Sequence, residues 1–267
     1  MLKNKADSER NIEEFSREIK KAAEENKESF LTWFNNNENI RAVISSGYKD
    51  FFCHILKREV YDLTKENSNE LIAMEIGCGG GRIMNAAAKY FKRVIGLDIH
   101  DNLEDTDNFL RQLGNNNFET KKIQGLAFPL LDKSLDFIYS IIVFQHIMKI
   151  ETFLSYLKET SRVLKDTGVA IIYFGRPKFL SGLPVKNSLL NKLLVMLDRI
   201  FFEELYLNIF KGGFSEYPEA ETNYVNLVVS VKKAKKMFSR YNLKIIDRGI
   251  SDKNNMYGCQ YYFSVRK

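Results

Sequence analysis

The segment Met74–Arg82, which reads MEIGCGGGR, constrains the fold of this chain more than any other. It follows an apolar run and precedes a helical pattern, and Val94–Asp98 is a second apolar run that ends in an acid. Glycine has no Cβ, so the backbone turns tightly here and a ligand can lie against the main chain. A carboxylate at the tip of the second strand can accept hydrogen bonds from a ribose diol. The segment therefore predicts a strand, a glycine turn, a helix and a second strand that hold a nucleoside-like ligand.

The spacing of the glycines distinguishes between cofactors. The dinucleotide fingerprint G-x-G-x-x-G has its third glycine at the position of Arg82, which argues against a dehydrogenase. This chain has instead Gly77, Gly79 and Gly81, preceded by Glu75. The pattern resembles motif I of the class I S-adenosylmethionine (SAM) dependent methyltransferases, roughly E/D-x-G-x-G-x-G. An ordinary glycine-rich turn of another α/β fold is the alternative, and the later motifs disfavour it.

The resemblance implies roles for the residues around this turn. The glycines let the amino acid part of SAM approach the backbone, and Glu75 accepts hydrogen bonds near its ammonium group. Asp98 binds the ribose hydroxyls, with a helix N-cap as its alternative role, and Ile99 covers the adenine. The family often has an acid near Gln124, so the amide oxygen of Gln124 or the neighbouring backbone takes that role here. The expected cofactor-binding residues are Glu75, Gly77, Cys78, Gly79, Gly81, Asp98, Ile99, Gln124, Gly125 and Leu126.

Two later segments extend the resemblance. Asp132–Ser140 resembles the fourth-strand segment of the family, in which Asp136 orders a turn. Arg162–Gly168 resembles the R-V-L-K-P-G-G turn of the family, although two of its residues differ. The resemblance covers residues 70–175 well and the C-terminal strands loosely.

Strand and helix patterns alternate between residues 71 and 174, which predicts an α/β fold with a mostly parallel, doubly wound sheet. Two final strands, 243–248 and 260–265, resemble the antiparallel pair that completes the seven-stranded sheet of these methyltransferases. The other expected strands are 71–76, 94–97, 118–123, 135–142 and 169–174, and the expected helices among them are 83–90, 103–113, 150–164 and 227–241.

Four segments are expected along the chain. Residues 1–68 form an N-terminal helical cap with helices over 7–34 and 40–64, and residues 69–175 form the cofactor-binding core. Residues 176–224 form a helical insertion over the substrate, and residues 225–267 complete the sheet. Leucine and phenylalanine recur at helical spacing within the insertion, which indicates an amphipathic helix. Its charges have both signs, which favours a lid packed on the core over a helix on a membrane surface.

Composition limits the partners of this 267-residue chain. Its net charge of +6 favours anionic ligands weakly, and a generic surface charge is an equal alternative. The cysteines Cys53, Cys78 and Cys259 lie far apart without metal spacing, so no metal is expected, and Cys78 is interpreted as a small turn residue. There is no signal-peptide pattern and no apolar run of about 18 residues. We therefore expect a cytoplasmic monomer or homodimer without a nucleic-acid partner or stable membrane insertion.

Candidate residues for the chemistry follow the strands. His146 comes directly after the fourth strand, at the edge where doubly wound sheets bind ligands. Histidine has an unperturbed pKa near neutrality, so His146 is the candidate general base for a hydroxyl acceptor, and orienting the cofactor is an equal alternative. Tyr48, Arg176 and Lys178 are expected to line the acceptor site, where the cations suit a phosphate or carboxylate.

Together these features predict a methyltransferase that moves a methyl group from SAM to a hydroxyl or amine of a small anionic metabolite. A phosphorylated or nucleotide-linked sugar for polysaccharide biosynthesis at the cell surface is the expected example. No D/N-P-P-Y/F motif follows the fourth strand, which argues against methylation of nucleic-acid bases. A lipid or quinone acceptor and a SAM-binding regulator without catalysis stay open as alternatives.

Overall fold

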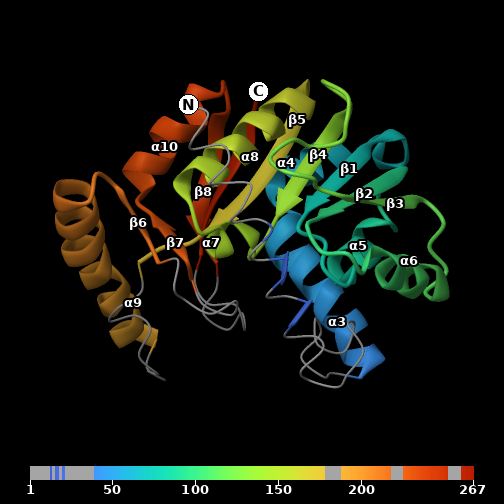
Figure 1. The fold of residues 1–267 in the computed structure, drawn as a ribbon, viewed down its shortest axis with the longest axis horizontal. Coiled ribbons are helices and arrows are strands. Elements are labelled where there is room, and N and C mark those ends of the chain that lie inside the picture. Colours follow the sequence, from blue (N-terminus) through green and yellow to red (C-terminus); the bar gives the residue numbers. More distant parts are fainter. Residues whose placement is uncertain are drawn as a thin grey trace.

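The protein is built around one seven-stranded sheet. A computed structural model describes residues 13, 16–17, 20–21, 39–177, 188–217, 225–251 and 260–267. The strand order is β3-β2-β1-β4-β5-β9-β8, with β1 to β5 parallel and β9 antiparallel to both neighbours (Figure 1). The strands are β1 Ile72–Ile76, β2 Arg93–Asp98, β3 Phe118–Lys122, β4 Leu135–Ser140, β5 Leu164–Phe174, β8 Lys244–Ile250 and β9 Tyr261–Arg266. This arrangement confirms the predicted doubly wound α/β fold.

Helices cover both faces of the sheet, so the core has two halves (Figure 1). One half packs under Phe153 of α8 and Phe238 of α10, and the other packs under Phe51 and Ile83. The central strand β4 is buried at all six positions, as its apolar sequence predicts for a strand covered on both faces. The helices are α3 Ile40–Asp50, η1 Phe51–Ile55, α4 Arg58–Thr64, η2 Ser68–Glu70, α5 Arg82–Ala87, α6 Leu103–Gln112, α7 Val143–His146, α8 Ile150–Val163, α9 Ser188–Leu197, η3 Asp198–Phe210 and α10 Val231–Arg240.

The two later sequence motifs stabilise the sheet. Asp136 accepts hydrogen bonds from the Ile72 backbone (3.0 Å) and from Lys165 Nζ (2.7 Å), and so joins β4 to both of its neighbours. Arg162 donates to Glu159 and to Asp132, and also to backbone oxygens of the loop before β4. Asp136 therefore has a structural role, but it links strands, whereas the sequence predicts that it orders a turn.

The first described helix, α3, packs closely against α5, which begins where the glycine turn ends. A Cβ on Gly47 of α3 would lie 2.2 Å from the backbone oxygen of Arg82, so only glycine fits there. Arg82 donates to Asp50 of α3 at 2.6 Å, and both side chains are nearly buried. This contact holds the predicted region 40–64 over the turn. The predicted helix 7–34 lies almost wholly outside the described residues, and the four-segment division stays a prediction.

The expected helix over 227–241 is wrong at its start. Leu227–Val229 is a strand, β7, which pairs antiparallel with β6 (Phe214–Glu216) in a second, two-stranded sheet. The helix α10 begins only after Ser230, whose side chain accepts a hydrogen bond from the Lys233 backbone as an N-cap.

Within the part of the chain that the structure describes, no helix is long and apolar enough to cross a membrane.

The close approach of α3 and α5 predicts that a glycine-to-alanine substitution within a helix lowers the stability of this protein. Replacing glycine by alanine within a helix normally stabilises by about 0.5–1 kcal/mol. Because a Cβ at Gly47 meets backbone of α5, we expect Gly47→Ala to destabilise by about 1–3 kcal/mol. Urea unfolding monitored by circular dichroism measures the change, with exposed Ser45→Ala of the same helix as the control. A rise in the unfolding midpoint of Gly47→Ala would contradict the packing described here.

Candidate cofactor site

The glycine turn lies between the tips of β1 and β2. The backbone nitrogens of Gly77 and Cys78 both donate to Leu97 O, at 2.7 and 3.1 Å. Gly77, Gly79 and Gly81 have positive φ angles of 76°, 48° and 78°, a region that side chains strain. A Cβ on Gly77 would also lie 2.0 Å from the Val143 side chain. The local sequence therefore folds this way because three of its residues lack a side chain.

Asp98, the last residue of β2, fixes the turn. Its Oδ2 accepts from the Gly79 backbone at 2.7 Å and its Oδ1 accepts from the Ile99 backbone at 2.7 Å. The residue is only 7% exposed. A carboxylate oxygen has two acceptor positions, so each oxygen of Asp98 retains one for a ligand. The N-cap of α6 is Asn102, so Asp98 does not have the alternative role of capping that helix.

Glu75 lies beneath the turn, buried in the face covered by α3 and α5. Burial raises the pKa of its carboxyl to about 8. A hydrogen bond from the Tyr139 hydroxyl (3.1 Å) and the charge of Arg82 oppose this rise, and the charges of Asp98 and Asp50 add to it. The site thus holds a carboxyl group that titrates near neutral pH and responds to any charge brought to the turn.

Cys78 is a packing residue of the turn. Its side chain fills the space above Gly96, where a Cβ would lie 2.8 Å from the sulfur. Burial raises the pKa of its thiol well above the ordinary value, which keeps the sulfur neutral. The structure therefore supports the interpretation of Cys78 as a small turn residue and not as a nucleophile.

The predicted adenine side of the site lies next to Asp98. The Ile123 backbone donates to Asp98 O at 2.7 Å, so the loop that follows β3 starts beside the tip of β2. In this loop Gln124 is exposed and Gly125 has a φ of 70°. Ile99 packs partly buried against the core. The structure therefore brings the expected adenine-binding residues to the same edge as the turn.

His146 ends α7, the short helix beyond β4. The helix lies against the turn, because Val143 occupies the space next to Gly77. Gln145 Nε2 lies 3.2 Å from His146 Nε2, so the amide and the imidazole are within hydrogen-bond distance of each other. The backbone oxygens of Gln145 and His146 accept from Asn226, at 2.7 Å from the backbone nitrogen and 3.4 Å from the side chain. The segment before β7 thus holds His146 in place at this edge.

The structure does not bring the three expected acceptor-binding residues together at one place, unlike the expected cofactor-binding residues. Tyr48 is half-buried on α3 and stacks on Phe52, with ring centroids 6.4 Å apart. Arg176 follows β5 directly but is only 2% exposed, and its charge acts on the nearby Tyr261 hydroxyl. Lys178 lies outside the described residues. Of these three, Arg176 alone is placed at the carboxyl end of a core strand.

Several residues of the site were not found from the sequence. Thr106 of α6 donates its hydroxyl to Gly79 O at 2.8 Å, and buried His100 lies 3.7 Å from Asp98 Oδ2. Tyr139 is the partner of Glu75 in the β1–β4 register. Tyr139 lies in an expected strand, but nothing in the local sequence marks it or Thr106 as a neighbour of the turn.

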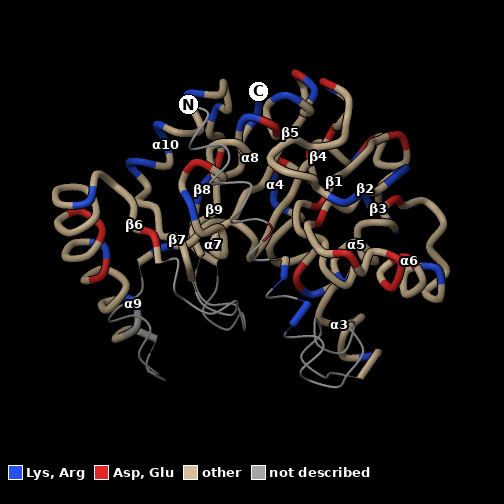
Figure 2. The backbone as a smooth tube through the Cα atoms, viewed as in Figure 1, with Lys and Arg blue, Asp and Glu red and all other residues tan. Residues whose placement is uncertain are grey.

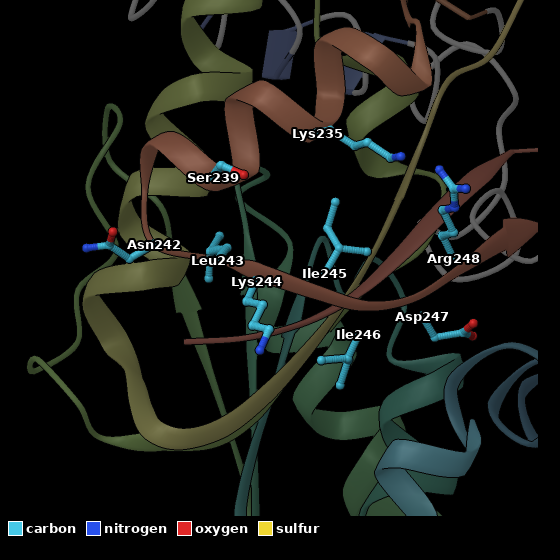
Figure 3. Close-up of a pocket in the computed structure, with 9 residues that line it drawn as sticks. All are labelled: Lys235, Ser239, Asn242, Leu243, Lys244, Ile245, Ile246, Asp247 and Arg248. Atoms are coloured by element: carbon cyan, nitrogen blue, oxygen red, sulfur yellow. The ribbon is translucent and has the colours of Figure 1, made fainter.

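A groove of about 730 Å³ lies elsewhere, between α10 and the edge strand β8 (Figure 3). Figure 3 shows Lys235 of α10 and Arg248 of β8 pointing toward one another across it. The strand β8 is at the opposite end of the sheet order from β2 and β3. This groove has no glycine turn and no carboxylate at a parallel strand tip, so it is not the candidate cofactor site.

Comparison with protein families identifies a methyltransferase domain over residues 74–172. Comparison with curated proteins found no match. Among solved structures, a SAM-dependent methyltransferase from Methanosarcina mazei is 18% identical with a TM-score of 0.54, over 79% of this chain and 98% of that one. Geranyl diphosphate methyltransferase in complex with its substrate and sinefungin is 14% identical with a TM-score of 0.52, over 83% and 77%. The [4+2]-cyclase SpnF is 10% identical with a TM-score of 0.54, over 85% and 81%.

At these identities the solved structures establish the fold, and the domain match adds the enzyme class. The domain spans the glycine turn, Asp98 and His146 but not the N-terminal helices or the insertion. Together the match and the fold confirm the predicted resemblance to SAM-dependent class I methyltransferases, and the match confirms the prediction of a methyltransferase domain.

The raised pKa of Glu75 predicts a pH dependence of stability. Between pH 4.5 and about pH 8 the Glu75 carboxyl keeps its proton in the folded protein but has lost it in the unfolded chain. The stability that Glu75 contributes is therefore full below pH 4.5 and is lost as the pH rises toward 8. The slope approaches about 1.4 kcal/mol per pH unit. We expect Glu75→Gln to flatten this part of a urea-unfolding series across pH. The exposed neighbour Glu70→Gln is the control, and an unchanged slope in Glu75→Gln would contradict the prediction.

Proposed function

We propose that this chain, a SAM-dependent methyltransferase by its domain, transfers the methyl group to a hydroxyl or amine of a small anionic molecule. The observation that carries the proposal is the Asp98 carboxylate, held against Gly79 at the end of β2 with acceptor positions left on both oxygens. An acceptor such as a phosphorylated or nucleotide-linked sugar for surface polysaccharides fits this proposal.

The residues at the turn fit SAM. The positive-φ glycines would leave the backbone open to the amino acid part, and the Asp98 carboxylate at the tip of β2 would accept from the two ribose hydroxyls. The buried Glu75 carboxyl, half-ionised near pH 8, suits a nearby ammonium group, since a positive charge favours its ionised form. When bound, SAM supplies an activated methyl group on a sulfonium that needs no further activation by the protein.

The chain then has to position the acceptor, exclude water and, for a neutral hydroxyl, remove a proton. His146 is the candidate for the proton, because a neutral imidazole can accept one and this ring ends the helix α7, which lies beyond β4 at the ligand-binding edge. Its helix lies against the glycine turn through Val143, which places the imidazole at the ligand-binding edge. Full turnover by a His146→Ala variant would remove this role.

An anionic acceptor is supported by Arg176. This guanidinium lies directly after β5 and is nearly buried, where an ionic hydrogen bond is stronger than at the surface. A fold neighbour, geranyl diphosphate methyltransferase, has a substrate that carries a diphosphate. Lys178, two residues further on, is proposed to reach the same group, and Tyr48 is proposed to approach it from α3.

The role of Asp98 can be tested by binding alone. We expect Asp98→Asn to weaken SAM binding about tenfold or more, because the substitution removes the charge from the ribose hydrogen bonds. Isothermal titration calorimetry measures the dissociation constant. The control is Asp101→Asn, three residues away, whose exposed carboxylate pairs only with surface Lys122 among the described contacts. Equal SAM affinities for wild type and Asp98→Asn would contradict the assignment.

The acceptor class can be tested by turnover. Matched sugars with and without a phosphate differ only in the group that Arg176 is proposed to bind. We expect kcat/KM for the phosphorylated member of a pair to be higher by about tenfold or more, the size of one charge-assisted hydrogen bond. Wild-type protein, SAM and a product-detection assay suffice. Equal turnover of both members, with SAM binding intact, would defeat the anionic acceptor and leave the methyltransferase assignment standing.

A further inference from the structure

The helical segment formed by α9 and η3 carries a long exposed apolar face. Seven large side chains spaced along it are between 44% and 72% exposed. The first three recur at intervals of three and four residues, so they lie on one side of the helix. Single exposed apolar residues are common, but a continuous row of seven marks an interaction surface. This apolar helix face consists of Leu193, Met196, Ile200, Phe201, Leu205, Ile209 and Phe210.

The opposite side of the same segment is fixed to the core. Glu203 is 1% exposed and accepts from the Val231 backbone at 2.8 Å and from the Tyr261 hydroxyl. Ser230 donates to Asn208 at 2.6 Å. These bonds attach η3 to the start of α10 and to β9, so the helix has a defined orientation. The apolar helix face is therefore presented outward by a well-anchored element.

Burial also changes the charge that this segment presents. The five charged residues of the segment and Lys211, which follows it, include three acids, but Asp198 and Glu203 are each 1% exposed. The exposed charges are the cations Lys192, Arg199 and Lys211 and the single acid Glu204. In the sequence, positive and negative charges are nearly equal in number, which favours a lid. At the surface of the folded protein, positive charges predominate.

More cations lie beside the end of η3. Lys233 of α10 lies over the ring of Phe214, which follows η3, at 5.4 Å. Lys232 and Lys236 on the same helix are exposed. Figure 2 shows basic residues along α10, and Figure 1 shows α9 at the end of the molecule opposite β3 and α6. The apolar helix face therefore has basic surroundings at its C-terminal end.

We propose that the apolar helix face lies on an anionic phospholipid bilayer. A helix with exposed apolar residues on one side and cations at its flanks binds in the interfacial plane, with the cations at the lipid phosphates. A second copy of this chain fits less well, because each copy would bring three exposed cations, Lys211 after the helix included, against one exposed acid, and these would repel. The inference concerns a surface of the fold and is independent of methyl transfer.

Vesicle flotation with the purified full chain tests the proposal. We expect wild type to float with vesicles of phosphatidylcholine and phosphatidylglycerol, less with phosphatidylcholine alone, and less as salt rises. The double variant Ile200→Glu, Phe201→Glu should bind vesicles about tenfold more weakly or worse, since it places two negative charges where apolar side chains would enter the bilayer. The matched control is Leu131→Glu, 81% exposed on a loop outside this segment, which should float as wild type does. SAM binding and the melting temperature verify that each variant is folded.

Three results would overturn the proposal. One is wild type that stays unbound with both kinds of vesicle. Another is flotation of the double variant equal to that of wild type. The third is a dimer, detected by light scattering, that the double variant dissociates while vesicles remain unbound, because the face would then be covered by a second copy.

Discussion

The hydrogen bond from the Gly79 backbone to the Asp98 carboxylate is the interaction on which the candidate site depends. It joins the turn after β1 to the tip of β2, so that the turn has one shape before any ligand arrives. A buried carboxylate is costly unless it is hydrogen-bonded, and here two backbone N–H groups offset that cost. Thr106 secures the other side of Gly79, and the glycines allow the backbone angles that this shape requires. A preformed turn of this kind binds a ligand without first having to order itself.

The helices before the sheet contribute to the same arrangement. Arg82 stands where a dinucleotide-binding turn would have glycine, and its side chain pairs with Asp50 of α3. The pair is nearly buried, so removing either partner would leave an uncompensated charge close to Glu75. Gly47 brings the two helices close enough for this contact. The residue that excludes one cofactor class thus fixes the position of the N-terminal helices.

Much of the fold could be predicted from the sequence because its signals are local. The alternation of apolar strands and amphipathic helices and the glycine turn predicted a doubly wound, mostly parallel sheet, and the family resemblance added its antiparallel final pair. Signals that depend on distant partners were lost. Glu203 reads as an ordinary charged helix residue, and its partners Val231 and Tyr261 are 28 and 58 residues away. Leu227–Val229 continues into a helical pattern and was therefore interpreted as helix, although Ser230 is a recognisable N-cap.

In the candidate site, too, the features with a local sequence signal could be predicted and those that depend on distant partners could not. Glycine spacing and the position of Asp98 could be predicted, since both follow from a local strand–turn–helix pattern. Arg176 was expected to line an open pocket because the sequence shows its charge but not its burial. Its charge acts on Tyr261 of β9, which comes near it only in the folded chain. The residues proposed to bind the acceptor are therefore the part that sequence determines least, and Tyr48, Arg176 and Lys178 all lie outside the matched domain.

The most direct test of the account is a crystal structure of the protein with SAM. The account predicts electron density for the nucleoside along the turn, with the ribose hydroxyls on Asp98, the amino acid part against Gly79 and the methyl group facing the loop that carries His146. Crystals soaked at saturating SAM with this turn empty, or with SAM bound at another place such as the groove of α10 and β8, would contradict it.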